Sequence, residues 1–236
     1  MNPVLIIRHA KTEGPGFLGE FLSKHDIPFV LIKIDEGDEV PEKAILFSGI
    51  AMMGGPMSVN DDLPWIAKEI SLIRDAVKLD IPLIGHCLGG QMMSKAFGAK
   101  VSANPVKEIG WGDVFVSDNL EAKKWFGNYP SFLGFHWHGE TFDLPIGATH
   151  LLTSQYCMNQ AWSMGKHLAM QCHVEMTEEM VISWCDHGED ELKASASSPA
   201  VAQAKQIKKS LSNLIPTLNE VAYQVYSQWI KGLSVR

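Results

Sequence analysis

The chain has 236 residues, of which 46% are hydrophobic, and a formal net charge of −7 at pH 7. A chain of this length and apolar content can bury a full core, so we expect it to be folded throughout. The acidic balance argues against binding to nucleic acid or to an anionic membrane surface, because both need clustered Lys and Arg side chains. A small soluble substrate or another protein is the expected partner.

The amino terminus shows no sign of a targeting segment. The apolar residues 4–7 have no basic stretch before them and no small-residue cleavage site after them. No apolar run approaches the roughly 20 residues that span a bilayer. We therefore expect a cytoplasmic protein with no membrane segment.

The four cysteines lack the paired spacing of a metal site, and a reducing compartment disfavours disulfides. We predict no metal site, and we expect at least one cysteine to be present for its reactivity. The four are Cys87, Cys157, Cys172 and Cys185.

Short apolar runs alternate with longer amphipathic stretches through the first half of the chain. The predicted strands are residues 4–8, 29–34, 44–48 and 82–86. The predicted helices are residues 17–25, 64–79 and 88–97. This alternation predicts an α/β fold, with a mostly parallel central sheet covered by helices on both faces.

The second half of the chain has shorter strand-like segments interrupted by Gly and Pro, which predict a small antiparallel addition. These segments are residues 113–117, 131–138 and 150–155. Residues 160–163 and 168–172 are predicted to form a hairpin, because the four residues between them have turn chemistry. The second strand of this hairpin leads to His173.

The C-terminal part has helical periodicity at residues 177–187 and 200–230, with an exposed loop predicted at residues 194–199. These helices carry too little apolar surface to form a core of their own. We therefore expect residues 1–236 to form a single domain, with a core of about 1–187 and a C-terminal helical extension of about 188–236.

The first chemically informative segment is residues 85–91, Gly-His-Cys-Leu-Gly-Gly-Gln, which places Cys87 between an apolar strand and a helix. A nucleophile at such a turn is held in a strained, exposed conformation, and small neighbours let a substrate approach its sulfur. The N-terminus of the following helix favours the thiolate. A buried cysteine packed in a glycine-rich turn would have the same local sequence.

A thiolate nucleophile needs a nearby imidazole, and residues 171–175, Gln-Cys-His-Val-Glu, contain one with an acid two residues later. Alternation along a strand places His173 and Glu175 on the same side, so the carboxylate can fix the tautomer of the ring. The chain contains nine histidines, and a His-x-Glu pair alone is also common as an ordinary solvated pair.

A third segment, residues 54–59, begins Gly-Gly-Pro and follows the predicted strand 44–48. Adjacent glycines allow a backbone N–H to point at an oxyanion, as acyl transfer requires. By itself this segment would be only a turn.

The order of these three segments resembles the class I glutamine amidotransferases, the glutaminase domains with a Cys-His-Glu triad. That family shows Gly-Gly-Pro, then Gly-x-Cys-x-Gly-x-Gln, then Gln-x-His-x-Glu, and this chain fills every fixed position. The resemblance continues through residues 108–111 and 137–142, and it covers most of residues 4–180. It is strongest to the stand-alone branch similar to the glutaminase domain of GMP synthetase, which implies a flavodoxin-like arrangement.

The resemblance implies a role for each matching position. Cys87 would form a γ-glutamyl thioester, while His173 moves the proton and Glu175 orients His173. The backbone N–H groups of Gly55 and Leu88 would form the oxyanion hole. The remaining implied residues would hold the glutamyl substrate: Met57, Gln91, Trp137 and His138. The resemblance implies no cofactor.

Two positions depart from the family pattern. His86 stands where the family more often has an aliphatic residue, and Glu140 stands where aspartate is more usual. His86 could perturb Cys87 electrostatically or simply pack, and packing is the favoured interpretation. Other conspicuous residues are predicted to fill the core, namely Met52, Met53, Met92, Met93, Trp162, Trp184, Trp229 and the three remaining cysteines.

The sequence leaves three functions open. The chain has no ATP-binding glycine-rich loop with a lysine, so a true amidotransferase would need an ammonia-accepting enzyme as a separate chain. A γ-glutamyl peptidase acting on glutathione-like substrates would use the same thioester and release another amine. A non-catalytic regulatory protein with this fold is the third possibility, and the intact triad argues against it.

Overall fold

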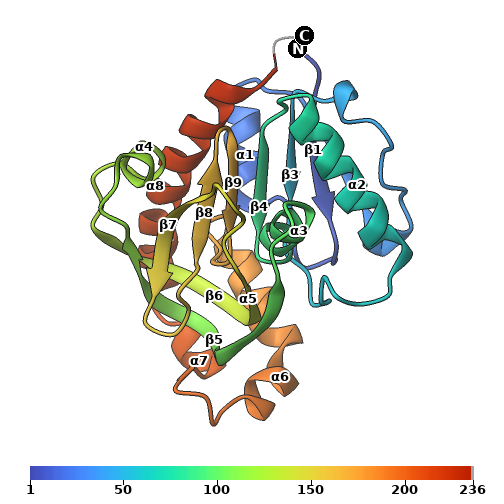
Figure 1. Cartoon of the computed structure of the whole chain (residues 1–236). Coiled ribbons are helices and arrows are strands. Elements are labelled where there is room, and N and C mark those ends of the chain that lie inside the picture. Colours follow the sequence, from blue (N-terminus) through green and yellow to red (C-terminus); the bar gives the residue numbers. More distant parts are fainter. Residues whose placement is uncertain (235–236) are drawn as a thin grey trace.

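The computed structural model describes residues 1–234, which contain one ten-stranded sheet with helices on both faces (Figure 1). The strands are β1 (Val4–Arg8), β2 (Phe29–Lys33), β3 (Gly49–Met52), β4 (Leu83–His86), β5 (Val101–Val116), β6 (Ser131–Phe142), β7 (Thr149–Ser154), β8 (Ala161–Met164), β9 (His167–Met170) and β10 (Ala200–Val201). The helices are α1 (Gly16–Lys24), α2 (Pro64–Lys78), α3 (Leu88–Ala96), α4 (Leu120–Phe126), α5 (Glu178–His187), α6 (Glu189–Ala194), α7 (Ala204–Ile207) and α8 (Leu211–Trp229). Short 3₁₀ turns lie at Ile34–Glu36, Ala44–Leu46 and Ile230–Gly232.

The sheet has a parallel half and an antiparallel half. Its strand order is β2-β1-β3-β4-β9-β8-β7-β5-β10, and β6 pairs with β5 outside this path. The pairs from β2 to β9 are parallel, whereas β9, β8, β7 and β5 pair antiparallel with one another in turn. The predicted α/β fold with an antiparallel addition is therefore confirmed.

Alternate residues of the central strand β1 face opposite sides of the sheet and belong to two separate cores. Val4 and Ile6 pack in one core with α1 and α8. Leu5 and Ile7 pack in the other with α2 and α3. All four side chains are fully buried, which explains why the strand is a continuous apolar run rather than an alternating one.

The strand predicted at residues 44–48 is wrong. Ala44–Leu46 forms a 3₁₀ turn, and the strand begins later, at Gly49. Leu46 is more than half exposed, whereas all of β3 is buried between β1 and β4. Burial in the middle of a parallel sheet therefore selected the second apolar run and not the first.

The helix predicted at residues 200–230 is also wrong in its first third. Residues 200–201 form β10, which pairs with Glu108 and Ile109 of β5. The short helix α7 follows, and Ser210 then adopts a left-handed conformation before α8 begins. Backbone pairing at the edge of the sheet overrides the helical periodicity there.

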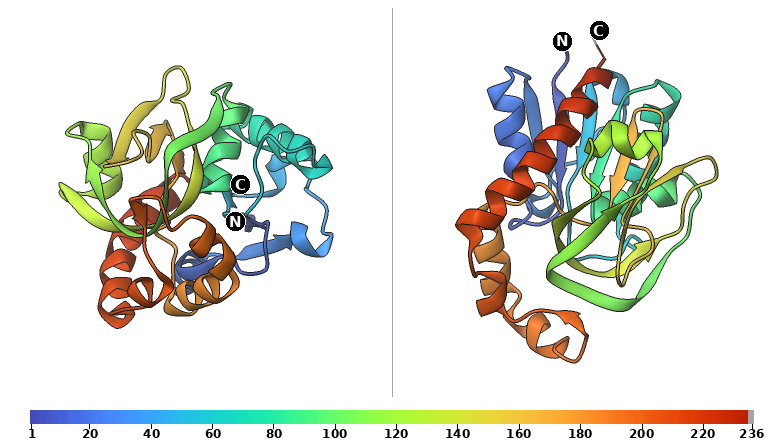
Figure 2. Two further views of the ribbon diagram at one scale, coloured as in Figure 1. Left: turned by 90° about the horizontal axis from the view of Figure 1, so that it is seen from below. Right: turned by 90° about the vertical axis from the view of Figure 1, so that its left-hand side faces the viewer.

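The two strands predicted at 113–117 and 131–138 are parts of a much longer antiparallel ribbon. Strands β5 and β6 pair from Val101 to Phe115, with a shift in register between Ala103 and Glu108. The hairpin predicted around residues 164–167 is present as β8 and β9. The ribbon curves across the carboxyl ends of the parallel strands (Figure 2), so it can form one wall of a site at that edge.

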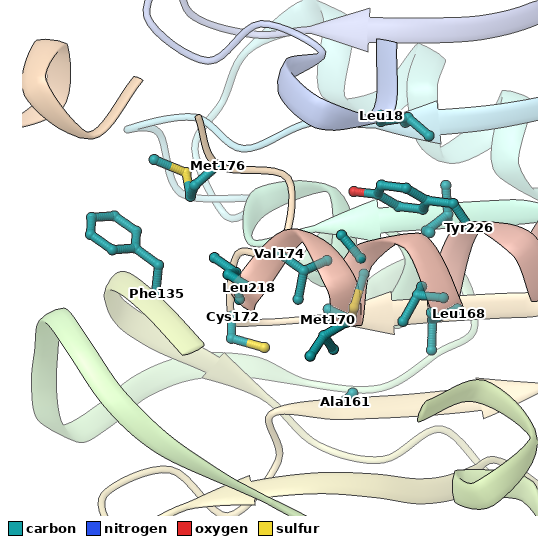
Figure 3. Close-up of a cluster of buried hydrophobic side chains, with 14 of the residues drawn as sticks. Leu18, Phe135, Ala161, Leu168, Met170, Cys172, Val174, Met176, Leu218 and Tyr226 are labelled. Carbon is teal, nitrogen blue, oxygen red and sulfur yellow. The ribbon is translucent and has the colours of Figure 1, made fainter. Parts of the chain in front are cut away.

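Helix α8 places an apolar face under the segment that leads to His173. Leu218 and Tyr226 of this helix lie with Met170, Cys172 and Val174 in one buried cluster (Figure 3). Within residues 1–234 no helix combines the length and apolar character that crossing a bilayer requires.

We expect Leu218→Ala to lower the free energy of unfolding by about 2–5 kcal/mol, because it removes a buried side chain from this cluster. The matched control is Leu120→Ala. Leu120 is 86% exposed, and its loss should change the free energy by less than about 0.5 kcal/mol. Urea unfolding followed by circular dichroism measures both, and equal effects would contradict the packing role of α8.

Candidate active site

Cys87 occupies a strained turn between β4 and α3. Its backbone has φ 50° and ψ −108°, a region that costs a residue with a side chain about 1–3 kcal/mol. Two backbone hydrogen bonds hold it there, from Cys87 N to Met170 O at 2.8 Å and from Gln91 N to Cys87 O at 3.0 Å. The strain expected from the sequence is observed, but the side chain is only 7% exposed and is reached through a pocket.

The glycines that flank Cys87 allow α3 to begin in close contact with its neighbouring strands. A Cβ atom at Gly89 would lie 2.7 Å from Met52 Cβ, and one at Gly90 would lie 2.5 Å from Met170 O. A larger residue at either position would therefore push α3 away from β3 and β9. This packing brings Cys87 next to Met170 at the end of β9. Met170 is three residues before His173.

His173 and Glu175 form a buried pair beside this turn. His173 Nδ1 lies 2.6 Å from Glu175 Oε1, and both side chains are 1% exposed. The backbone N–H of His173 donates to Phe135 O of β6 at 2.9 Å. His173 is thus fixed by the ribbon, which holds its backbone, and by the carboxylate, which orients its ring.

The electrostatics of the pair favour a charged imidazole. Burial by itself would lower the pKa of His173, but the Glu175 carboxylate and the nearby Cys87 side chain raise it well above its usual value. Burial would likewise raise the pKa of Glu175, but the charges of His173 and His86 lower it to about 2. No hydrogen-bond partner is found for His173 Nε2 in the described part of the chain, and this is the nitrogen left for proton exchange with Cys87.

Trp184 of α5 covers the His173 ring. The two ring centroids are 4.8 Å apart at an angle of 87°, and Trp184 Nε1 donates to Thr12 O at 2.7 Å. Trp184 is buried, as predicted from its apolar character, but it also connects the triad to the loop after β1. Its sequence position gave no indication of this contact.

Gln171 is a further neighbour of the sulfur that sequence reasoning did not assign. Its Nε2 lies 3.5 Å from Cys87 Sγ, and its Oε1 accepts a hydrogen bond from Gln91 Nε2 at 3.1 Å. An amide N–H directed at sulfur stabilises a thiolate. The available signal was the first position of the Gln-x-His-x-Glu motif. Gln91, expected in the substrate pocket, lies close to the nucleophile through this link.

The two residues expected to form the oxyanion hole, Gly55 and Leu88, are in contact. A Cβ atom at Gly55 would be 2.8 Å from Leu88 Cδ2, so the segment after β3 contacts the first residue of α3. Leu88 N is the first amide of the helix, which has no carbonyl partner within the helix. Both N–H groups therefore belong to segments that border Cys87.

A pocket of about 610 Å³ opens over Cys87 and His173. Its walls include all four predicted substrate-binding residues, which are Met57, Gln91, Trp137 and His138. They come from the segment after β3, from α3 and from the ribbon strand β6. Glu140 lies on the same wall, where its Oε1 accepts a hydrogen bond from Ser58 Oγ at 3.0 Å.

His138 is held by the protein at both ring nitrogens. Its Nδ1 lies 3.0 Å from Glu140 O, and its Nε2 lies 3.0 Å from Glu108 Oε2. Glu108 is itself bonded to Ser154 and Gln160, so a buried polar network supports this wall of the pocket. The ring of His138 therefore positions the wall, and the neighbouring Glu140 lines the pocket.

His86 lies beneath the triad rather than beside the sulfur. The side chain is fully buried, with Nε2 3.1 Å from Tyr226 Oη and 3.8 Å from Glu175 Oε2. Burial lowers the pKa of His86. The interpretation of His86 as a packed residue accounts for its burial but misses its contact with the triad carboxylate.

Comparison with known proteins gives a consistent assignment. The glutamine amidotransferase class-I family matches residues 20–180. A glutamine amidotransferase-like protein of Salmonella typhimurium, YfeJ, is 30% identical over 77% of this chain and 76% of its own length. The crystal structure of a glutamine amidotransferase from Methylobacillus flagellatus is 44% identical, with a TM-score of 0.96 over 99% of this chain and 96% of that one.

Two more distant relatives have different names. GMP synthase of Bacillus pumilus is 30% identical over 66% of this chain, which spans only 28% of that protein. Gamma-glutamyl peptidase 3 of Arabidopsis thaliana is 26% identical over 59% of each chain. The family match covers more than half of the chain and includes Cys87 and His173. The chain belongs to the class I glutamine amidotransferase family.

Proposed function

We propose that this protein is a cysteine-dependent amidohydrolase that cleaves the side-chain amide of glutamine or of a γ-glutamyl compound. The observation that carries the proposal is the buried His173–Glu175 pair, which faces the strained Cys87 across one pocket. A strained nucleophile, a base and a group that orients the base form the minimal set for acyl transfer through a covalent intermediate.

Acylation begins when the Cys87 sulfur attacks the amide carbon and a C–S bond forms. The electron pair of the carbonyl moves to oxygen, and the N–H groups of Gly55 and Leu88 stabilise the negative charge. His173 carries the thiol proton and gives it to the departing nitrogen as the C–N bond breaks. A γ-glutamyl thioester and free ammonia or amine result.

Deacylation repeats these steps with water as the nucleophile. Water attacks the thioester carbon and gives a proton to His173, and a second oxyanion forms in the same hole. The C–S bond breaks, the sulfur recovers the proton from His173, and glutamate leaves. Glu175 keeps Nδ1 of the ring occupied throughout, so that Nε2 exchanges the proton.

Two substrates fit this chemistry. With glutamine, the ammonia would pass to an acceptor enzyme on a separate chain, in line with the GMP synthase relative. With a γ-glutamyl peptide or amide, the product would be another amine, in line with the γ-glutamyl peptidase relative.

The four free thiols fit the reducing cytoplasm in which we place the protein.

The proposal is tested by assaying glutamine, glutathione and a panel of γ-glutamyl amides for release of ammonia or amine, with and without cell extract. We expect slow turnover of glutamine by the purified chain and faster turnover with a better γ-glutamyl donor or an added partner. Glutamine turnover of roughly 10 per second, with no gain from any donor or extract, would contradict this expectation.

We expect Cys87→Ala to abolish amide hydrolysis while the fold stays intact, because no other thiol of the described residues lies in the pocket. A glutamine-directed electrophile should modify Cys87 before the other cysteines. Burial raises the pKa of Cys157 and of Cys185 to about 11, so both remain protonated at neutral pH. Mass spectrometry that finds another cysteine modified first would refute the assignment.

We expect Glu175→Gln to lower kcat by roughly 10²–10⁴-fold, because the ring of His173 loses the carboxylate that orients it. The same change alters the pH dependence of stability. His173, whose pKa is raised, stabilises the native protein fully below about pH 6.5, and this contribution is lost as pH rises toward its folded pKa.

In Glu175→Gln, burial lowers the pKa of His173, so the difference in unfolding free energy between wild type and variant should shrink as pH rises from about 6.5 to 9. Urea unfolding at several pH values measures this difference. A difference that is constant over this range would show that the two residues are not electrostatically coupled.

A further inference from the structure

Glu13 is an acidic residue of the pocket that the triad mechanism does not use. It lies in the loop between β1 and α1 and lines the same pocket as Cys87 and His173. Its backbone N–H donates to Ala10 O at 2.9 Å, and the next residue back, Thr12, is held by Trp184. The loop is therefore fixed against the cover of the His173 ring.

The Glu13 carboxylate lies against Gly54 of the oxyanion segment, close to the His173 ring. A Cβ atom added at Gly54 would overlap Glu13 Oε2 and lie 3.2 Å from His173 Cε1. The missing side chain at Gly54 is thus what makes room for the carboxylate. The His173 atom near that position is Cε1, which lies between Nδ1, which contacts Glu175, and Nε2, which serves the nucleophile.

This carboxylate lies near the His173 ring but forms no ion pair with it. Throughout residues 1–234 neither oxygen of Glu13 has a hydrogen-bond or ion-pair partner. Burial raises the pKa of Glu13 to about 7, although the neighbouring His173 and His9 favour the ionised form. A half-buried acid at this place is stabilised by a cation that enters the pocket.

Three other charged side chains line the pocket, and each already has a partner within the protein. Lys107 pairs with Glu191 and lies against Gly139 of the ribbon, and Glu140 bonds to Ser58. Glu191 also accepts a hydrogen bond from Trp137 Nε1 at 2.8 Å, and Trp137 is one of the residues expected to hold the glutamyl group. Glu13 follows Thr12, whose carbonyl accepts a hydrogen bond from Trp184, and Trp184 covers the His173 ring.

The position of Glu13 relates it to the leaving group. In acylation the departing nitrogen must receive a proton from His173 Nε2, so the amine half of the substrate lies beside that ring. A negative charge here attracts an amine that carries a second, protonated nitrogen. When the leaving group is an amino acid, as in a γ-glutamyl peptide, its α-carboxylate is only two bonds from the departing nitrogen. The negative charge of Glu13 repels that carboxylate.

We propose that Glu13 determines leaving-group specificity and that the preferred substrates are γ-glutamyl amides of cationic amines rather than γ-glutamyl peptides. This inference rests on the proposed function and narrows its substrate class. The amine accepts one proton from His173 as the C–N bond breaks, and its second ammonium group keeps its proton and its contact with Glu13.

Three γ-glutamyl compounds of nearly equal size test the proposal: the 2-aminoethyl amide, which is cationic, the propyl amide, which is neutral, and γ-glutamylglycine, which is anionic. We expect kcat/KM to fall in that order for the wild type, with roughly tenfold or more between the first and the last. Amine release is measured for each compound at pH 8.

The isosteric variant Glu13→Gln should remove this order. Its kcat/KM should fall for the cationic amide, change little for the neutral amide and rise for γ-glutamylglycine. Glu20→Gln is the matched control, because Glu20 lies exposed on α1 and its loss changes the net charge equally. That control should keep the wild-type order.

Two results would overturn the inference alone. One is equal kcat/KM for the three compounds in the wild type. The other is a Glu13→Gln variant that loses the same factor with all three compounds, since that would show that Glu13 only supports His173. Absence of turnover of all three compounds, with no labelling of Cys87 by the glutamine-directed electrophile, would overturn the proposed function and this inference with it.

Discussion

The site depends on one buried charge pair, His173 with Glu175. Removing two charged groups from water costs several kcal/mol per ion, and their attraction offsets this cost only when the geometry is well defined. The 2.6 Å contact between Nδ1 and Oε1 meets this condition. The fold must therefore hold both side chains with little freedom, and much of the surrounding structure serves that purpose.

The segment 172–176 carries the pair, and its three apolar side chains, which alternate with the two charged ones, hold the segment in place. Cys172, Val174 and Met176 point into the apolar cluster, where Leu218 and Tyr226 of α8 meet them (Figure 3). His173 and Glu175 consequently point the other way, toward Cys87. On the far side, Phe17 N donates to Glu175 O, which joins the same segment to α1. A C-terminal helix far from the pocket thus contributes to the orientation of the pair.

The sequence predicted those parts of the site that local patterns define. The strand-to-helix turn at Cys87 and the two-residue spacing of His173 and Glu175 are local features, and the structure brings the three residues together. The strand at 44–48 failed because two apolar runs compete there, and only burial between β1 and β4 selects the second. The pairing of Ala200 with β5 is a long-range contact that a helical period cannot reveal.

Three further residues of the site could not be predicted for the same reason, because their places depend on long-range contacts. Gln171, Trp184 and Glu13 have ordinary local surroundings, and each acquires its place by contact with a distant segment. The β1–α1 loop is 160 residues before His173, and no periodicity relates them. Chemistry at the ends of adjacent parallel strands is predictable from motifs, whereas the residues that recognise the rest of a substrate depend on how loops close over that edge.

His86 departs from the family pattern, and it lies against the carboxylate of the same His173–Glu175 pair. Glu175 Oε2 has no hydrogen-bond partner in the described chain, and an aliphatic residue at position 86 would leave it facing apolar atoms. His86 instead places a polar nitrogen 3.8 Å from that oxygen, and Tyr226 Oη binds the same nitrogen at 3.1 Å. Burial lowers the pKa of His86, and the nearby Glu175 carboxylate opposes this shift. The extra histidine therefore places a polar group beneath the Glu175 carboxylate, where burial of the ring opposes a positive charge.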